Sequence, residues 1–228
     1  MSFAVNYHTW VLDEFRPFIG RHFVEVGAGT GCFSRLLLNE HPSTACFVEP
    51  SQMFFELVKA VDASNNGTRV HLQQATFEGV FRSSSSPEEI DSVFYINVLE
   101  HIEDDIAELS LVYESLSEGG HCFIFVPALM ALYGSFDRTV GHFRRYSKAE
   151  IEQKVVDAGF VIRKSIYFDL LGILPWYINY KILRSSSLGG KAVSLYDRFG
   201  VPVTRALESV LPPVIGKNLL LVAEKSVR

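Results

Sequence analysis

The chain has 228 residues, of which 48% are hydrophobic and 21% charged, and its formal net charge is −5. This length suits one large domain or one domain with a long insertion, and the apolar content excludes a disordered chain. The negative charge removes the general attraction for phosphate backbones, so we expect no nucleic-acid partner. Three widely spaced cysteines predict free thiols, and the first residues lack the pattern of a signal peptide. We therefore expect a cytoplasmic protein.

The chain begins with a predicted helix that leads into a buried strand. Residues 6–18 place Trp10, Val11, Phe15 and Phe18 on one helical face. Residues 23–26 then form a short apolar run, which is typical of a strand inside a parallel sheet.

A glycine loop follows this strand and precedes a second predicted helix. Glycine permits positive φ and lets a ligand approach the backbone, while the helix start supplies unpaired N–H groups. The glycines stand at positions 27, 29 and 31, after the acidic Glu25. The dinucleotide fingerprint G-x-G-x-x-G does not fit, because Cys32 stands where its third glycine is needed. The alternative is a tight strand-to-helix turn without a ligand.

A second strand, 44–48, ends at Glu49, roughly twenty positions past the glycine loop. Ligands of open α/β sheets bind at the carboxyl ends of the strands, where an acidic residue can accept both hydroxyls of a ribose. Pro50 and Met53 would add apolar contacts to an adenine ring. A solvated glutamate at a strand end is the alternative.

The rest of the chain continues to alternate strands and helices. We expect further strands at 69–73, 90–96, 121–126, 160–166 and 219–224, and helices at 104–116 and after Ser147, which with Glu150 forms a capping box. This alternation predicts an α/β fold with a Rossmann-like, doubly wound sheet.

The glycine loop and the segment NVLEHI, at 97–102, resemble the class I S-adenosylmethionine-dependent methyltransferases. The stretch PALMALYGSFDRTVGHFRRY, at 127–146, looks like the type 11/12 branch, which methylates small molecules. The resemblance implies a seven-stranded sheet with the last strand antiparallel, S-adenosylmethionine as cofactor and S-adenosylhomocysteine as product. It implies cofactor contacts from Glu25, Gly27, Ala28, Gly29, Gly31, Glu49, Pro50, Met53, Thr76, Phe77, Asn97 and Val98. The acidic residue that the family usually carries after the third strand is missing here, so Gln74 or Thr76 would replace it.

The expected organisation is a single domain over residues 1–228. It comprises an N-terminal lid helix (1–20), a cofactor-binding core (21–166), a helical and aromatic insertion between the sixth and seventh strands (167–216) and the last strand (217–228). Four roles are open for the insertion: a pocket wall, a homodimer contact, an interfacial membrane segment or an ordinary buried helix pair. The protein is accordingly expected to be a monomer or a homodimer. Its most apolar stretch, 170–178, is too short to span a bilayer.

Methyl transfer is an in-line displacement, so catalysis depends mainly on holding the acceptor in a dry pocket. The candidate catalytic residues are His142, His101 and Tyr146, and the candidate substrate-binding residues are Tyr7, Trp10, Tyr133, Arg144, Arg145 and Trp176. The arginines either hold an anionic group of the acceptor or pair with acidic residues at 103–105 and anchor the loop. Some methyltransferases of the superfamily bind a divalent cation through E-x-x-E-H. Because Asn97 replaces the first of these ligands, we expect no metal.

The sequence therefore predicts methyl transfer to a small-molecule acceptor: a secondary metabolite, a sugar or a lipid-linked compound. The acceptor would be partly apolar, with an anionic group as a further hypothesis. Two alternatives stay open at this point. One is a non-catalytic regulatory or partner subunit that binds the nucleoside cofactor, and the other is an aminopropyltransferase.

Overall fold

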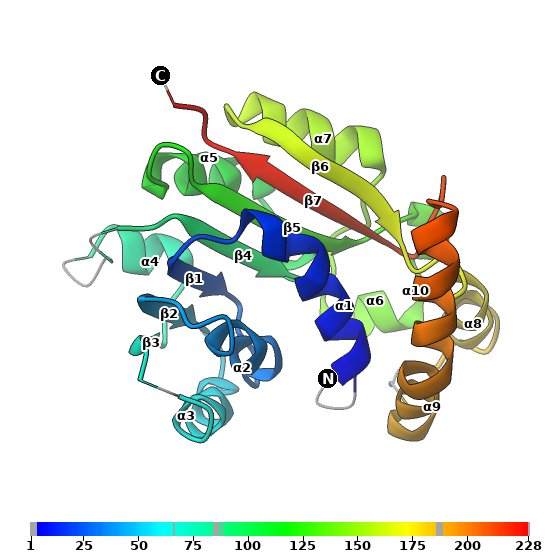
Figure 1. Ribbon diagram of the computed structural model, residues 1–228. Coiled ribbons are helices and arrows are strands. Elements are labelled where there is room, and N and C mark those ends of the chain that lie inside the picture. Colours follow the sequence, from blue (N-terminus) through cyan, green and yellow to red (C-terminus); the bar gives the residue numbers. More distant parts are fainter. Residues whose placement is uncertain (1–3, 66, 84–86, 88, 186–188, 228) are drawn as a thin grey trace.

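A single mixed sheet of seven strands organises the computed structural model, which describes residues 4–65, 67–83, 87, 89–185 and 189–227 (Figure 1). The strand order is β3-β2-β1-β4-β5-β7-β6, and β7 runs antiparallel to both of its neighbours. The expected Rossmann-like sheet with an antiparallel last strand is thus confirmed. The strands are β1 (His22–Val26), β2 (Thr44–Val48), β3 (Arg69–Gln73), β4 (Ser92–Ile96), β5 (His121–Pro127), β6 (Val161–Phe168) and β7 (Asn218–Glu224).

Helices cover both faces of this sheet (Figure 1). The first face is covered by α1 (Val5–Phe15), α2 (Cys32–Leu38) and α3 (Phe54–Asp62), together with the start of α10 (Val201–Val210). The second face is covered by α4 (Phe77–Phe81), α5 (Asp105–Ser115) and α7 (Lys148–Asp157). A short helix, α6 (Ser135–Val140), lies in the loop after β5. The chain is therefore wound on both sides of the sheet, as the βα alternation predicts.

The two cores follow from the alternation of side chains along each strand. In β4, Phe94 belongs to the core on the first face, whereas Val93 and Tyr95 belong to the core on the second. Phe94 stacks on Phe123 of β5 with ring centroids 4.5 Å apart. Because both faces are buried, the central strands are nearly continuous apolar runs, interrupted in β1 by Glu25. Each buried phenylalanine contributes about 1.5–3 kcal/mol.

The insertion between β6 and β7 is helical, as expected. It contains α8 (Ile173–Trp176), which continues through Tyr177–Ile182, and α9 (Gly190–Leu195), which continues through Tyr196–Gly200 into α10. Among the described residues, no helix is long and apolar enough to cross a membrane.

The strand register brings the ends of distant segments to one edge of the sheet. Val26, Val48 and Tyr95 are register partners near the carboxyl ends of β1, β2 and β4. Asn218, at the start of β7, pairs with both Pro127 and Phe168, which end β5 and β6. The loops after β1, β2, β4, β5 and β6 and the loop before β7 therefore share this edge.

Candidate active site

Three glycines after β1 adopt positive φ, at +66° for Gly27, +57° for Gly29 and +78° for Gly31. A Cβ on Gly27 would lie 2.6 Å from a methyl carbon of Val98, and one on Gly31 would lie 2.8 Å from Cβ of Ala60. Both positions therefore need glycine for packing as well as for backbone conformation. A Cβ on Gly29 would come no nearer than 4.0 Å to another heavy atom, so Gly29 borders open space.

Glu49, at the end of β2, holds this loop from the side. One carboxylate oxygen accepts the Gly29 N–H at 2.8 Å, and the other accepts the Ser51 N–H at 2.8 Å. The residue is only 4% exposed. Each oxygen keeps a lone pair for a further donor, so the carboxylate can also accept hydroxyl groups of a ligand.

Glu25 lies beneath the loop and accepts a hydrogen bond from the Ser34 hydroxyl. Burial, together with the nearby charge of Glu49, raises the pKa of Glu25 to about 8, although the Ser34 hydrogen bond opposes this shift. A cationic group bound nearby would favour its ionised form.

Asn97 and Val98 complete the site where β4 ends. Asn97 has a φ of +55°, and its N–H donates to the Phe125 carbonyl at 2.7 Å. This sharp exit from β4 lets the Val98 side chain cover Gly27.

The other predicted cofactor residues have varied surroundings. Ala28 is buried, and its N–H donates to the Val48 carbonyl, whereas Pro50 and Met53 are exposed. Thr76 caps α4 by accepting the Gly79 N–H, and Phe77 is 2% exposed in the core of the second face. The structure thus brings Gly27, Gly29, Glu49, Asn97 and Val98 to one edge, while Thr76 and Phe77 are engaged in local packing.

Comparison with known proteins assigns the chain to a family. Residues 11–165 match the family model described as a methyltransferase domain. The chain belongs to this family. It is a class I, S-adenosylmethionine-dependent methyltransferase, and the expected enzyme class and cofactor are confirmed. No curated protein matches the sequence.

Solved structures share the fold at low sequence identity. The methyltransferase from Mesorhizobium loti is 14% identical, with a TM-score of 0.61 over 94% of this chain and 97% of that one. The methyltransferase from Archaeoglobus fulgidus is 15% identical, with a TM-score of 0.60 over 96% and 94%. The [4+2]-cyclase SpnF is 16% identical, with a TM-score of 0.64 over 98% and 81%. Identities this low show the fold alone, and SpnF shows that the same fold occurs in a protein described as a cyclase.

The glycine loop of this methyltransferase fits S-adenosylmethionine. Gly29 leaves room for a ligand against the backbone, and the Glu49 carboxylate beside it has lone pairs for ribose hydroxyls. If the methionine portion lies beside Glu25, its ammonium group would favour the ionised form of this carboxyl.

Several predicted substrate residues gather around Lys217 at the same edge of the methyltransferase. The Lys217 ammonium lies 5.0 Å from the centre of the Tyr7 ring and 5.5 Å from that of Trp176, and it pairs with buried Asp169 at 2.6 Å. Trp10 is only 3% exposed and lies over Phe168, so it packs in the core beside this group. The rings of Tyr7 and Trp176 therefore lie around the Lys217 ammonium group at cation–π distances.

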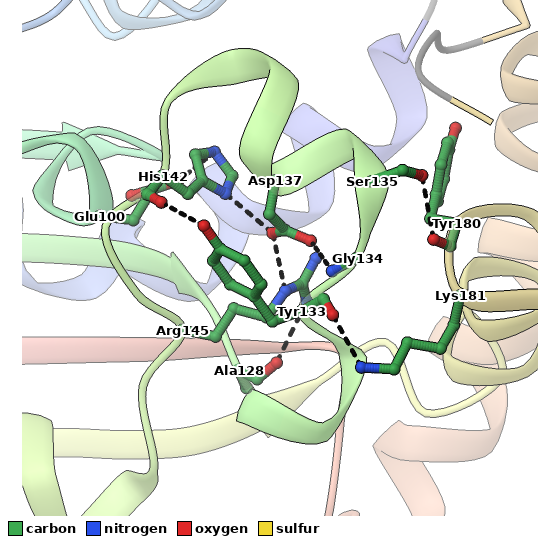
Figure 2. A network of polar contacts seen from close by, with 10 residues as sticks. All are labelled: Glu100, Ala128, Tyr133, Gly134, Ser135, Asp137, His142, Arg145, Tyr180 and Lys181. Atoms are coloured by element: carbon green, nitrogen blue, oxygen red, sulfur yellow. Dashed lines mark hydrogen bonds and ion pairs between the residues drawn. The ribbon is translucent and has the colours of Figure 1, made fainter. Parts of the chain in front are cut away.

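The two arginines predicted to bind the acceptor are paired within the chain. Arg144 is 2.8 Å from the Asp105 carboxylate and donates a hydrogen bond to the Glu103 carbonyl. Arg145 donates a hydrogen bond to the Asp137 carboxylate at 2.8 Å (Figure 2). Arg145 is only 3% exposed. Of the two alternatives for these arginines, the structure favours anchoring of the loop.

The candidate catalytic residues differ in their surroundings. His142 is hydrogen bonded to Asp137 at 2.9 Å and stands edge-on to His101, with ring centroids 4.6 Å apart. Tyr146 is fully buried and donates to Asp105, and burial raises the pKa of its phenol. Tyr133 donates to the His142 carbonyl (Figure 2). His101 and His142 therefore form a pair, whereas the Tyr146 hydroxyl supports the loop.

Sequence reasoning missed three charged residues that organise the edge: the buried Asp137 and Asp169, and the partly exposed Lys217. Asp169 follows directly after the apolar end of β6, and a charge in such a place is a usable sequence signal. Asp137 gave no such signal, because it lies in a loop where acidic residues are common.

Proposed function

We propose that this methyltransferase acts in the cytoplasm on a small acceptor that is partly apolar, carries an anionic group and is linked to a lipid. The observation that supports this most strongly is the insertion, which combines exposed apolar side chains with exposed basic ones. We prefer this function to the two alternatives, an aminopropyltransferase and a non-catalytic subunit, because the chain belongs to a family of methyltransferases.

The chemistry requires few special groups from the protein. S-adenosylmethionine supplies a sulfonium methyl group, which is transferred by in-line displacement. Glu49 and the glycine loop would orient the cofactor, and the rings of Tyr7 and Trp176 would keep water away from the reacting atoms. Lys217 lies between these rings but is already paired with Asp169 at 2.6 Å, so the exposed basic side chains of the insertion would attract the anionic group of the acceptor.

The insertion supports delivery of the acceptor from a membrane surface. Among its described residues, 167–185 and 189–216, every exposed charged side chain is basic: Lys181, Arg184, Lys191, Arg198 and Arg205. Its acidic residues, Asp169, Asp197 and Glu208, are buried. Exposed apolar side chains include Leu174, Leu183, Leu195, Phe199, Val203, Val210 and Leu211, each more than 55% exposed. Apolar groups beside basic ones suit the interface of an anionic bilayer.

The cofactor site is tested by titrating the protein with S-adenosylhomocysteine in a calorimeter. We expect Glu49→Ala to weaken binding at least tenfold, or about 1.4 kcal/mol, because it removes the ribose acceptor and the support of the Gly29 N–H. Glu56→Ala is the control, since Glu56 is an exposed carboxylate on α3. Equal affinity in wild type and Glu49→Ala would contradict this assignment.

The membrane proposal is tested by flotation with vesicles. We expect the protein to float with vesicles that contain phosphatidylglycerol, and less with pure phosphatidylcholine, because anionic lipid attracts the basic side chains. Phe199→Asp should reduce flotation several-fold, whereas Phe55→Asp should not. The two phenylalanines are 58% and 57% exposed, but Phe55 lies on α3, outside the insertion.

Two results would count against membrane binding. In the first, the wild-type protein stays in solution with both kinds of vesicle. In the second, Phe199→Asp changes the sedimentation coefficient but not flotation, which would identify the insertion as a homodimer contact.

A further inference from the structure

Two segments far apart in the sequence meet beside the end of β4. Glu100 and His101 belong to the single turn Leu99–His101 that follows Asn97 and Val98, and His142 lies in the loop after α6. The Phe143 N–H donates to the Glu100 carbonyl at 2.8 Å and joins the two segments. As a result, one ligand atom from each of Glu100, His101 and His142 lies within 4.8 Å of the others.

The Glu100 carboxylate is the unusual member of this group. The residue is 0% exposed, and neither of its side-chain oxygens has a hydrogen-bond partner among the described residues. Nε2 of His142 lies 3.8 Å from one of these oxygens. Burying an unpaired carboxylate costs several kcal/mol, and a cation bound to it would offset that cost.

Each of the two histidine rings is hydrogen bonded to another group of the protein, as metal-binding histidines usually are. Nδ1 of His142 is 2.9 Å from Asp137, whose carboxylate also accepts hydrogen bonds from Arg145 and the Gly134 N–H (Figure 2). An acceptor so placed requires His142 to donate through Nδ1, which leaves the Nε2 lone pair on the side of Glu100. The His101 ring is likewise hydrogen bonded to the backbone of Gly141.

We propose that Glu100, His101 and His142 bind one divalent transition-metal ion of the first row. Two imidazoles and one carboxylate suit zinc, iron or cobalt better than magnesium or calcium, which prefer oxygen ligands alone. The sequence predicts no metal, because Asn97 replaces the first residue of the E-x-x-E-H pattern. His142 supplies a third ligand from a distant segment, so that replacement is no longer decisive.

Three protein ligands leave further coordination positions open, as in catalytic zinc sites. An oxygen of the acceptor would bind there, since Glu100 and His101 lie in the turn that follows Val98, which covers Gly27. This last step rests on the proposed function, whereas binding of the metal does not.

The test uses tag-free protein that has been treated with a chelator and then titrated with Zn²⁺ alone, and separately with Co²⁺ alone. We expect one equivalent to bind per chain, with a visible cobalt absorption typical of nitrogen and oxygen ligands. Glu100→Gln and His142→Gln should each weaken binding more than about a hundredfold, because even residues behind the ligands are worth 10–100-fold. His121→Gln is the matched control, since His121 and Glu224 are another histidine–carboxylate pair, 3.5 Å apart.

Absence of saturable binding to the folded wild-type protein would overturn the metal site, and so would equal binding by Glu100→Gln. Circular dichroism and a titration with S-adenosylhomocysteine are made on the same samples. Intact cofactor binding without metal binding would reject this site and leave the proposed function standing. Metal binding without cofactor binding would support this metal site and count against the proposed function.

Discussion

Replacing Gly29 by alanine should leave the methyltransferase folded and remove its affinity for S-adenosylhomocysteine. The positive φ of Gly29 makes a side chain cost about 1–2 kcal/mol, but the new methyl group would come no nearer than 4.0 Å to another heavy atom. That methyl group would instead occupy the space where we place the cofactor. We expect affinity to fall at least about a hundredfold, or 2.7 kcal/mol, as measured by calorimetry.

Two other glycines separate backbone strain from loss of the binding space. Gly141→Ala carries the strain alone, since Gly141 has a φ of +81° and open surroundings. In urea, Gly141→Ala should lose about as much unfolding free energy as Gly29→Ala, and it should keep its affinity for S-adenosylhomocysteine. Gly27→Ala adds a clash with Val98, so it should be destabilised more than either. Full affinity in Gly29→Ala would mean that the cofactor lies elsewhere.

The sequence predicted best those features that depend on local pattern. The strands Thr44–Val48 and Arg69–Gln73 begin and end where their apolar and β-branched residues predict. Ser147 caps α7 by accepting the Glu150 N–H, as its spacing from Glu150 indicates. The fourth strand is shorter than expected and begins at Ser92, because the Asp91 carboxylate accepts the backbone N–H groups of Arg21 and His22.

Prediction was weakest where long-range contacts decide a residue's role. The sequence shows that 138–148 is rich in basic residues and offers the acidic residues at 103–105 as partners, and Arg144 does pair with Asp105. It does not indicate that Asp137 is the partner of Arg145. Asp105 reaches Arg144 because the loop after β5 is joined to the turn after β4, where the Phe143 N–H donates to the Glu100 carbonyl. Asp137 and Arg145 lie within that loop, and its local folding brings them together. No periodicity encodes such pairings. The roles of both arginines in binding the acceptor remain predictions, as do those of Tyr133 and Trp176.

Asp137→Ala should cost about 3–5 kcal/mol of unfolding free energy, the largest loss of stability that we expect. The carboxylate is fully buried and accepts hydrogen bonds from Arg145, His142 and the Gly134 N–H. Although burial opposes ionisation, the hydrogen bond from His142 and the charge of Arg145 keep the pKa of Asp137 below its usual value. Its removal leaves the Arg145 guanidinium buried without a partner charge.

Asp13→Ala is a matched control for urea unfolding, because Asp13 also pairs with two side chains, those of Arg16 and Arg205. Both arginines are exposed to solvent, so this variant should lose no more than about 1 kcal/mol. The double variant Asp137→Leu with Arg145→Met should be more stable than Asp137→Ala, since replacing both buried charges removes the uncompensated one. If Asp137→Ala costs no more than Asp13→Ala, the Trp176 ring and the Ala128 carbonyl, which already contact Arg145, suffice to hold its charge.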